Sequence, residues 1–111
     1  MRILRLTRHK ALPEQMAELA RIFGADIEIV EISETVPNAT RVVEIVTEHS
    51  ADVLEAVLPL NILADAVGSR GVTIPVIRAI TKREIVEGTK TAFTFSHYER
   101  VVRVEVQTER L

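Results

Sequence analysis

The chain has 111 residues, the size of one domain, and its composition of 47% hydrophobic and 27% charged residues is ordinary for a globular protein. Its formal charge of −2 excludes a uniformly basic nucleic-acid coat but leaves room for a local basic patch. No cysteine is present, which excludes disulfides and thiolate metal sites, and no apolar run approaches the roughly 20 residues that span a bilayer.

The chain begins with alternating apolar strands and amphipathic helices. Residues 2–6 predict a short strand. Pro13 suits the first turn of a helix, apolar residues follow at helical spacing as far as Phe23, and Gly24 occupies a helix C-cap position. Residues 26–34 predict the second strand, so one strand, helix and strand unit is complete.

The same pattern continues through the next part of the chain. Asn38 is a candidate N-cap for a second helix over residues 39–46, and residues 52–58 predict the third strand. A third helical stripe covers residues 60–67, and residues 74–80 predict the fourth strand. Strands that alternate with helices need crossover connections, which favour parallel pairing with helices on the sheet faces.

The predicted fold class is therefore α/β: a single Rossmann-like domain over residues 1–111, whose alternating core covers about residues 1–80. Past residue 81 the period changes to two, which predicts C-terminal antiparallel or edge strands over about residues 91–109. Of the segment "VVRVEVQTE", we expect Val102, Val104 and Val106 to face the core.

The segment "KREIVEGTK" between these two regions fits two structures. It is either a short helix or one arm of a hairpin that turns at Gly88, and the sequence does not decide between them.

Ligands of open parallel sheets bind outside the carboxyl ends of the strands. That rule brings four short segments together, which are residues 8–10, 33–35, 59–61 and 81–83. Their cations, Arg8, Lys10, Lys82 and Arg83, outnumber Glu34, and helix N-termini at the same edge add free N–H donors. We therefore expect an anionic ligand there, most plausibly a phosphate, although Lys10 and Lys82 taken alone fit a solvated loop equally well.

Among the three histidines, His9 is the functional candidate, because it lies at this edge and imidazole titrates near neutral pH. His49 at a helix end and His97 on an apolar strand face are expected to be structural. Tyr98, the only tyrosine, fits either stacking on a base or packing in the protein, of which packing is favoured. No metal-ligand spacing is present, and the first strand-to-helix turn has no glycine for a dinucleotide or P-loop motif. We expect neither a metal nor a cofactor.

Two segments, "LTRHKA" after the first strand and "AVLPLNILADAV" after the third, resemble the small stand-alone CRISPR-associated ring nucleases, relatives in fold of the CARF domains. Thr7, Arg8 and His9 match the Thr-Arg-His of that family. A Leu-Pro-x-x-Leu-Ala helix start is matched, in slightly different spacing, by Leu58, Pro59, Leu63 and Ala64. The segment "FSHYERVVRVEVQTERL" makes the C-terminal third longer than the family pattern.

The resemblance implies a homodimer that binds cyclic oligoadenylate, such as cyclic tetra-adenylate, across its two-fold axis and cuts it without a metal. A ribose 2′-hydroxyl would attack the adjacent phosphorus and leave a 2′,3′-cyclic phosphate, which would switch off type III CRISPR signalling in antiviral defence. Arg8 and His9 are then the catalytic candidates. The expected ligand-binding residues are Thr7, Lys10, Thr35, Pro59, Asn61, Lys82 and Arg83.

Two other functions fit the same residues: a nucleotide-sensing module that binds a ring without cutting it, and a structural or protein-interaction domain. In each case we expect no membrane and no long nucleic acid as partner. The N-terminus begins directly with a predicted strand, without a signal-peptide pattern, so we expect a cytoplasmic protein. Few Asn, Gln and Met beside many Glu, Arg, Ile and Val is a bias found in thermophile proteins.

Overall fold

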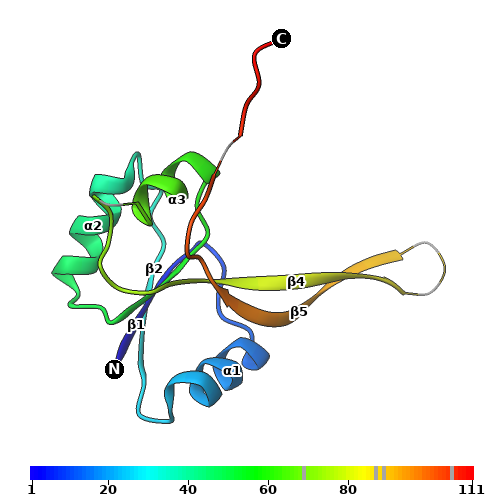
Figure 1. The fold of residues 1–111 in the computed structure, drawn as a ribbon. Coiled ribbons are helices and arrows are strands. Elements are labelled where there is room, and N and C mark those ends of the chain that lie inside the picture. Colours follow the sequence, from blue (N-terminus) through cyan, green and yellow to red (C-terminus); the bar gives the residue numbers. More distant parts are fainter. Residues whose placement is uncertain (69, 87, 89, 106) are drawn as a thin grey trace.

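Helices and strands alternate along the chain up to the fourth strand, as the periodicity predicts (Figure 1). The computed structural model describes residues 1–68, 70–86, 88, 90–105 and 107–111. The elements are β1 (Arg2–Leu6), α1 (Pro13–Phe23), β2 (Glu28–Ile32), α2 (Ala39–Glu48), β3 (Val53–Ala56), α3 (Leu60–Ala66), β4 (Val76–Val86) and β5 (Lys90–Arg100).

The helix ends follow from local chemistry. Pro13 is the first residue of α1, where its missing N–H needs no partner, and the Gln15 side chain accepts the N–H of Leu12 at 2.9 Å. Gly24 ends α1 with φ 100°, a backbone region that residues with a Cβ avoid. Asn38 is the N-cap of α2, and its Oδ1 accepts the N–H of Arg41 at 3.0 Å.

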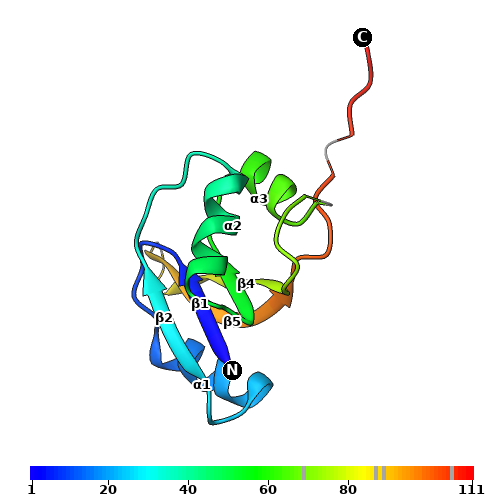
Figure 2. The ribbon, with the colours of Figure 1, turned by 90° about the vertical axis from the view of Figure 1, so that its left-hand side faces the viewer.

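The five strands form one sheet in the order β2-β1-β3-β4-β5. The first four strands are parallel, and β5 is antiparallel to β4, so the predicted α/β class with a mostly parallel sheet and a C-terminal antiparallel extension is confirmed. Helix α1 covers one face of the sheet, and α2 and α3 cover the other (Figure 2).

Each face has its own hydrophobic core, because successive residues of a strand point to opposite sides. Under α1, the buried residues Ile3, Leu19, Val53 and Ile77 pack together. The larger core lies between the sheet and the other two helices, and its fully buried members include Leu4, Val42, Leu54 and Ala66.

The segment "KREIVEGTK" belongs to a hairpin and not to a helix. β4 and β5 pair antiparallel from Ile77 opposite Arg100 to Val86 opposite Lys90, with a register shift between Ile80 and Thr81. Gly88 lies in the turn with φ 79°, while Glu87 and Thr89 lie outside the described residues. β3 pairs only with the beginning of β4, so the far part of the hairpin projects from the body as a two-stranded arm (Figure 1).

The prediction of strands over residues 91–109 is wrong in its second half, because β5 ends at Arg100 and no strand follows in residues 101–105 and 107–111. The Val101 N–H still donates to the Val76 carbonyl at 2.8 Å. The preceding residue of the partner strand, Pro75, directs its carbonyl to the Leu54 N–H of β3 at 2.9 Å, and no further pair of this ladder follows in the described residues.

The expected core face of this segment is present in only one of its two described residues. Val102 is 77% exposed, which contradicts the prediction, whereas Val104 does pack against the larger core. Val106 lies outside the described residues.

Candidate functional site

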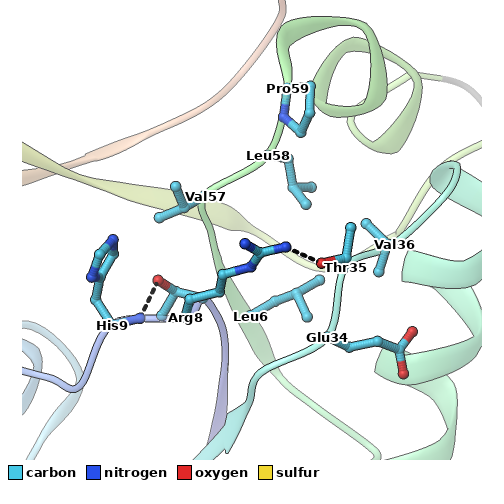
Figure 3. A pocket seen from close by; sticks show the side chains of 10 residues that line it. Leu6, Arg8, His9, Glu34, Thr35, Val36, Val57, Leu58 and Pro59 are labelled. Carbon is cyan, nitrogen blue, oxygen red and sulfur yellow. Dashed lines mark hydrogen bonds between the residues drawn. The ribbon is translucent and has the colours of Figure 1, made fainter.

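The loops that follow β1, β2 and β3 meet at the carboxyl edge of the sheet, where they enclose an open pocket of about 300 Å³ (Figure 3). We call it the strand-end pocket. Its lining residues are Leu6, Thr7, Arg8, His9, Glu34, Thr35, Val36, Val57, Leu58 and Pro59. Five of the predicted site residues, Thr7, Arg8, His9, Thr35 and Pro59, therefore line one cavity.

Arg8 supplies the cation of this pocket. Its guanidinium extends across the cavity, and Nη2 donates a hydrogen bond to Thr35 Oγ1 (Figure 3). Among the described residues, no carboxylate forms an ion pair with Arg8. The guanidinium is thus held in place by a neutral hydroxyl, and its charge is available to an anion.

Glu34 is the one carboxylate among the described residues that line the pocket, and Arg41 of α2 neutralises it. Arg41 binds it with both arms of its fork, from Nε to Oε2 at 2.7 Å and from Nη2 to Oε1 at 2.9 Å. The hydrogen bonds and charge of Arg41 lower the pKa of Glu34, so this carboxylate is ionised and paired. The strand-end pocket is therefore electrostatically favourable for an anion.

His9 lies beside Arg8, and a short turn sets its backbone. The His9 N–H donates to Thr7 Oγ1 at 3.2 Å, a local bond that threonine makes readily in turns. The imidazole extends toward Val57, while Arg8 points toward Thr35 (Figure 3). Within the described part of the chain the imidazole has no hydrogen-bond partner, so both ring nitrogens can meet a ligand.

Four other predicted residues do not line this pocket. Lys10 is exposed on the loop between β1 and α1, and Asn61 is exposed in the first turn of α3. The expectation that Lys82 and Arg83 follow a strand end is wrong, because β4 continues through them to Val86.

Lys82 and Arg83 are exposed on the arm, and as neighbours in a strand they point to opposite faces of it. Lys82 is paired with Thr94 and Arg83 with Phe93. A single chain can therefore direct only one of these two cations toward any one face of the arm.

A buried ionic network next to the pocket was not predicted. Arg5 and Glu55, only 2% and 1% exposed, sit side by side on β1 and β3, and Glu55 accepts bonds from Arg5 Nε at 3.0 Å and Nη2 at 3.1 Å. Tyr98 of β5 donates its hydroxyl to the same carboxylate at 2.8 Å. The available signal was a pair of opposite charges in two largely apolar strands, but only the register shows that they face each other.

This environment shifts the ionisation of two members of the network. Burial and the nearby Glu55 carboxylate raise the pKa of Tyr98, so its hydroxyl keeps its proton and remains a donor. Burial lowers the pKa of Arg5, but the hydrogen bonds and charge of Glu55, with Glu31, outweigh this effect and raise it overall. Tyr98 also packs on Phe95 at 5.2 Å between ring centroids, in line with the packing expected for it.

The two other histidines have structural surroundings. His49 caps the C-terminus of α2, and its Nδ1 lies 2.9 Å from the Ile45 carbonyl, as expected for a helix-end residue. His97, expected on an apolar face with Phe95, is instead exposed, between Ser96 at 2.8 Å and Glu99 at 3.0 Å. The register shift is the reason, because it pairs Phe95 with Thr81 but His97 with Ile80, on opposite faces.

The structure thus defines a Rossmann-like α/β domain with an anion-suited pocket at the carboxyl edge of its sheet. No family model, no curated protein and no solved structure matches the chain. Within the described residues there is no group of three or more side chains of metal-ligand type. None of the helices in these residues has the length and the apolar run that a membrane crossing requires.

Proposed function

We propose that this protein is a metal-independent ring nuclease that binds and cleaves cyclic oligoadenylate, with cyclic tetra-adenylate as its substrate. The observation that carries the proposal is the pairing of Arg8 and His9 at one open pocket, with Arg8 held by Thr35 and Glu34 neutralised by Arg41. A phosphodiester needs such a site: a cation for its oxygens and a proton-transferring group within reach.

Arg8 would bind the non-bridging oxygens of the phosphate. A guanidinium presents several N–H groups in one plane, so one can stay with Thr35 while others donate to the ligand. As the reaction proceeds, negative charge grows on those oxygens, and Arg8 stabilises it more strongly than in the ground state.

His9 would move one of the two protons of the reaction. The ribose 2′-oxygen forms a bond to phosphorus and loses its proton, while the bond from phosphorus to the 5′-oxygen breaks and that oxygen gains a proton. The products are a linear oligoadenylate with a 2′,3′-cyclic phosphate at the cut. Holding the 2′-hydroxyl in line with the leaving oxygen supplies the rest of the acceleration.

The size of the pocket supports a homodimer as the active form. A cavity of about 300 Å³ accommodates one phosphodiester and part of a neighbouring nucleoside, not a whole ring of four nucleotides. A two-fold ring presents the same phosphate to each of two identical sites, so two copies would bind it across their axis. Lys82 or Arg83 would then contribute from the arm, outside the pocket of its own chain.

A second candidate, binding of the ring without cleavage, is favoured by a different observation. Among the described lining residues, His9 is the one group free to exchange a proton, because Glu34 is tied to Arg41. Cleavage at a useful rate then depends on positioning or on a second group from the other subunit. A nucleotide sensor needs neither.

The deciding experiment incubates the purified protein with cyclic tetra-adenylate in excess EDTA and follows the ring by mass spectrometry. We expect linear products with a 2′,3′-cyclic phosphate, and a loss of about a hundredfold or more in rate for Arg8→Ala and for His9→Ala. Arg21→Ala, which removes an exposed cation of α1 that does not line the pocket, is the matched control and keeps most of the rate.

Two other results would contradict the nuclease. An intact ring that stays bound in native mass spectrometry contradicts the nuclease and supports the sensor. An intact ring that neither binds nor raises the melting temperature contradicts both and leaves a protein-interaction domain.

A further inference from the structure

The buried Arg5 is connected directly to the loop that carries the proposed catalytic residues. Two of its nitrogens bind Glu55, and the third, Nη1, donates to Glu31 Oε1 at 2.9 Å and to the backbone carbonyl of His9 at 3.2 Å. One guanidinium thus joins the sheet interior to the residue whose imidazole borders the strand-end pocket.

The remainder of this loop is held by the partners of Arg5. The Ala11 N–H donates to Glu31 Oε1 at 3.4 Å, and the Leu12 N–H donates to Gln15 Oε1 at 2.9 Å, which also lies 3.5 Å from Arg5 Nη2. Three backbone groups of residues 9–12 therefore end on Arg5 itself or on an oxygen that Arg5 contacts.

Stability alone is a weak reason for this arrangement. Two charges lose their hydration when they are buried, and an apolar pair of the same volume is often equally stable or more so. A buried fork that reaches a loop carbonyl does what an apolar pair cannot, because it fixes a polar backbone group in one place. Tyr98 strengthens this function by fixing Glu55 from β5.

We infer that Arg5, oriented by Glu55 and Tyr98, is a positioning residue that sets the loop of His9 for the reaction. Arg5 is not one of the residues that line the strand-end pocket, and it acts through the carbonyl of His9, which is one of them. The inference rests on the proposed function for its catalytic consequence, whereas the ordering of the loop can be measured without any activity.

The test variant is Arg5→Lys, and the matched control is Arg2→Lys. A lysine keeps the charge but replaces the planar fork by one ammonium group, which cannot serve Glu55, Glu31 and the His9 carbonyl together. Arg2 is on the same strand and makes the same kind of contacts, to Glu28 at 3.2 Å and to the His49 carbonyl. These contacts lie at the amino end of the strand, away from the strand-end pocket.

The first measurement is amide hydrogen exchange by NMR, with the core amide of Leu54 as the reference for global unfolding. In Arg5→Lys we expect the Ala11 and Leu12 amides to exchange about tenfold faster relative to Leu54, the factor that one lost charged hydrogen bond produces. Arg2→Lys should leave this ratio unchanged. A ratio that stays at the wild-type value in Arg5→Lys overturns the inference.

The second measurement separates binding from chemistry, with cyclic tetra-adenylate as the probe. We expect the single-turnover cleavage rate of Arg5→Lys to fall about a hundredfold, the effect of a small displacement of a catalytic group, with ring affinity within about threefold of wild type. A variant that loses affinity and rate in equal measure contradicts a positioning role.

Failure of the two proposals can be distinguished. If the wild-type protein does not cut the ring, the nuclease proposal fails, but the exchange ratio still reports on the loop. If Arg5→Lys does not fold, Tyr98→Phe decides, because it removes only the hydroxyl on Glu55; we expect about a threefold faster loop exchange, and no change would overturn the inference.

Discussion

Replacing Glu55 by leucine is expected to lower the free energy of unfolding by about 3 kcal/mol. The substitution leaves the Arg5 side chain, 2% exposed, without its bonds at 3.0 and 3.1 Å. Breaking a buried ion pair from one side typically destabilises a protein by about 3–5 kcal/mol. The remaining contact with Glu31, whose side chain is 40% exposed, places the expected value at the lower end.

The double variant Arg5→Met with Glu55→Leu should be more stable than the sum of the two single changes predicts. It removes both charges and leaves the Tyr98 hydroxyl as the group that loses its acceptor, at about 1–3 kcal/mol. Two single changes of about 3 kcal/mol each would add to about 6 if independent, so the cycle should give a coupling energy of about 3 kcal/mol or more.

Urea unfolding at pH 7 measures the free energy of unfolding of the wild type, the two single variants and the double variant. With a slope of about 1–3 kcal/mol/M, a loss of 3 kcal/mol moves the midpoint by about 1–3 M, well outside error. Equal slopes must be verified first, since a changed slope reports a changed denatured state. A coupling energy below about 1 kcal/mol would refute the reasoning, because it would mean that water reaches and screens the pair.

Three further outcomes are expected. Arg8→Ala should weaken binding of cyclic tetra-adenylate about tenfold to a hundredfold in calorimetry, the value of a charged hydrogen bond to phosphate, with an unchanged melting temperature; equal affinity would exclude Arg8 from the site. Glu34, whose pKa Arg41 lowers in the folded state, stabilises the fold above the usual glutamate pKa of about 4.3, and this contribution disappears as the pH falls through the lower folded value. Wild type should therefore lose more stability than Glu34→Gln between pH 5 and about pH 3 in urea titrations, and parallel curves would contradict the ion pair. Asn38→Ala removes the side-chain cap of α2 and should destabilise the protein by about 1 kcal/mol in thermal unfolding, whereas Thr40→Ala, in the first turn of the same helix but without a cap bond, should change it less.

Periodicity was sufficient for the elements of the parallel part of the sheet. Each strand and helix of that part buries a face that its own residues mark, such as Leu4 and Leu6 on β1 and Val42 and Ile45 on α2. The sequence was insufficient to predict the strand ends and the side-chain orientations that depend on pairing with a distant strand. The last contact between the two strands of the hairpin is that of Val101 with Val76, and one register shift turns His97 away from Phe95. Neither fact is visible in the local pattern.

The residues of the candidate site likewise fall into those that the sequence could place and those that it could not. Thr7, Arg8, His9 and Thr35 could be placed together because the carboxyl ends of neighbouring parallel strands must meet. The positions of Lys82 and Arg83 could not be predicted, because the length of β4 is set by its pairing with β5 and not by its own residues. Arg5 was missed because an arginine in a short strand is ordinarily on the surface, and only the register with Glu55 makes its burial possible.

The Arg5 and Glu55 pair also restricts how this sequence can diverge. A chain that loses either residue alone retains an uncompensated charge in its interior. A single substitution at either position is therefore destabilising and is expected to be selected against. Homologous sequences should therefore change the two together, into an apolar pair or a reversed one. In those that adopt an apolar pair, the residue that corresponds to Tyr98 should become phenylalanine, because its hydroxyl would have no acceptor.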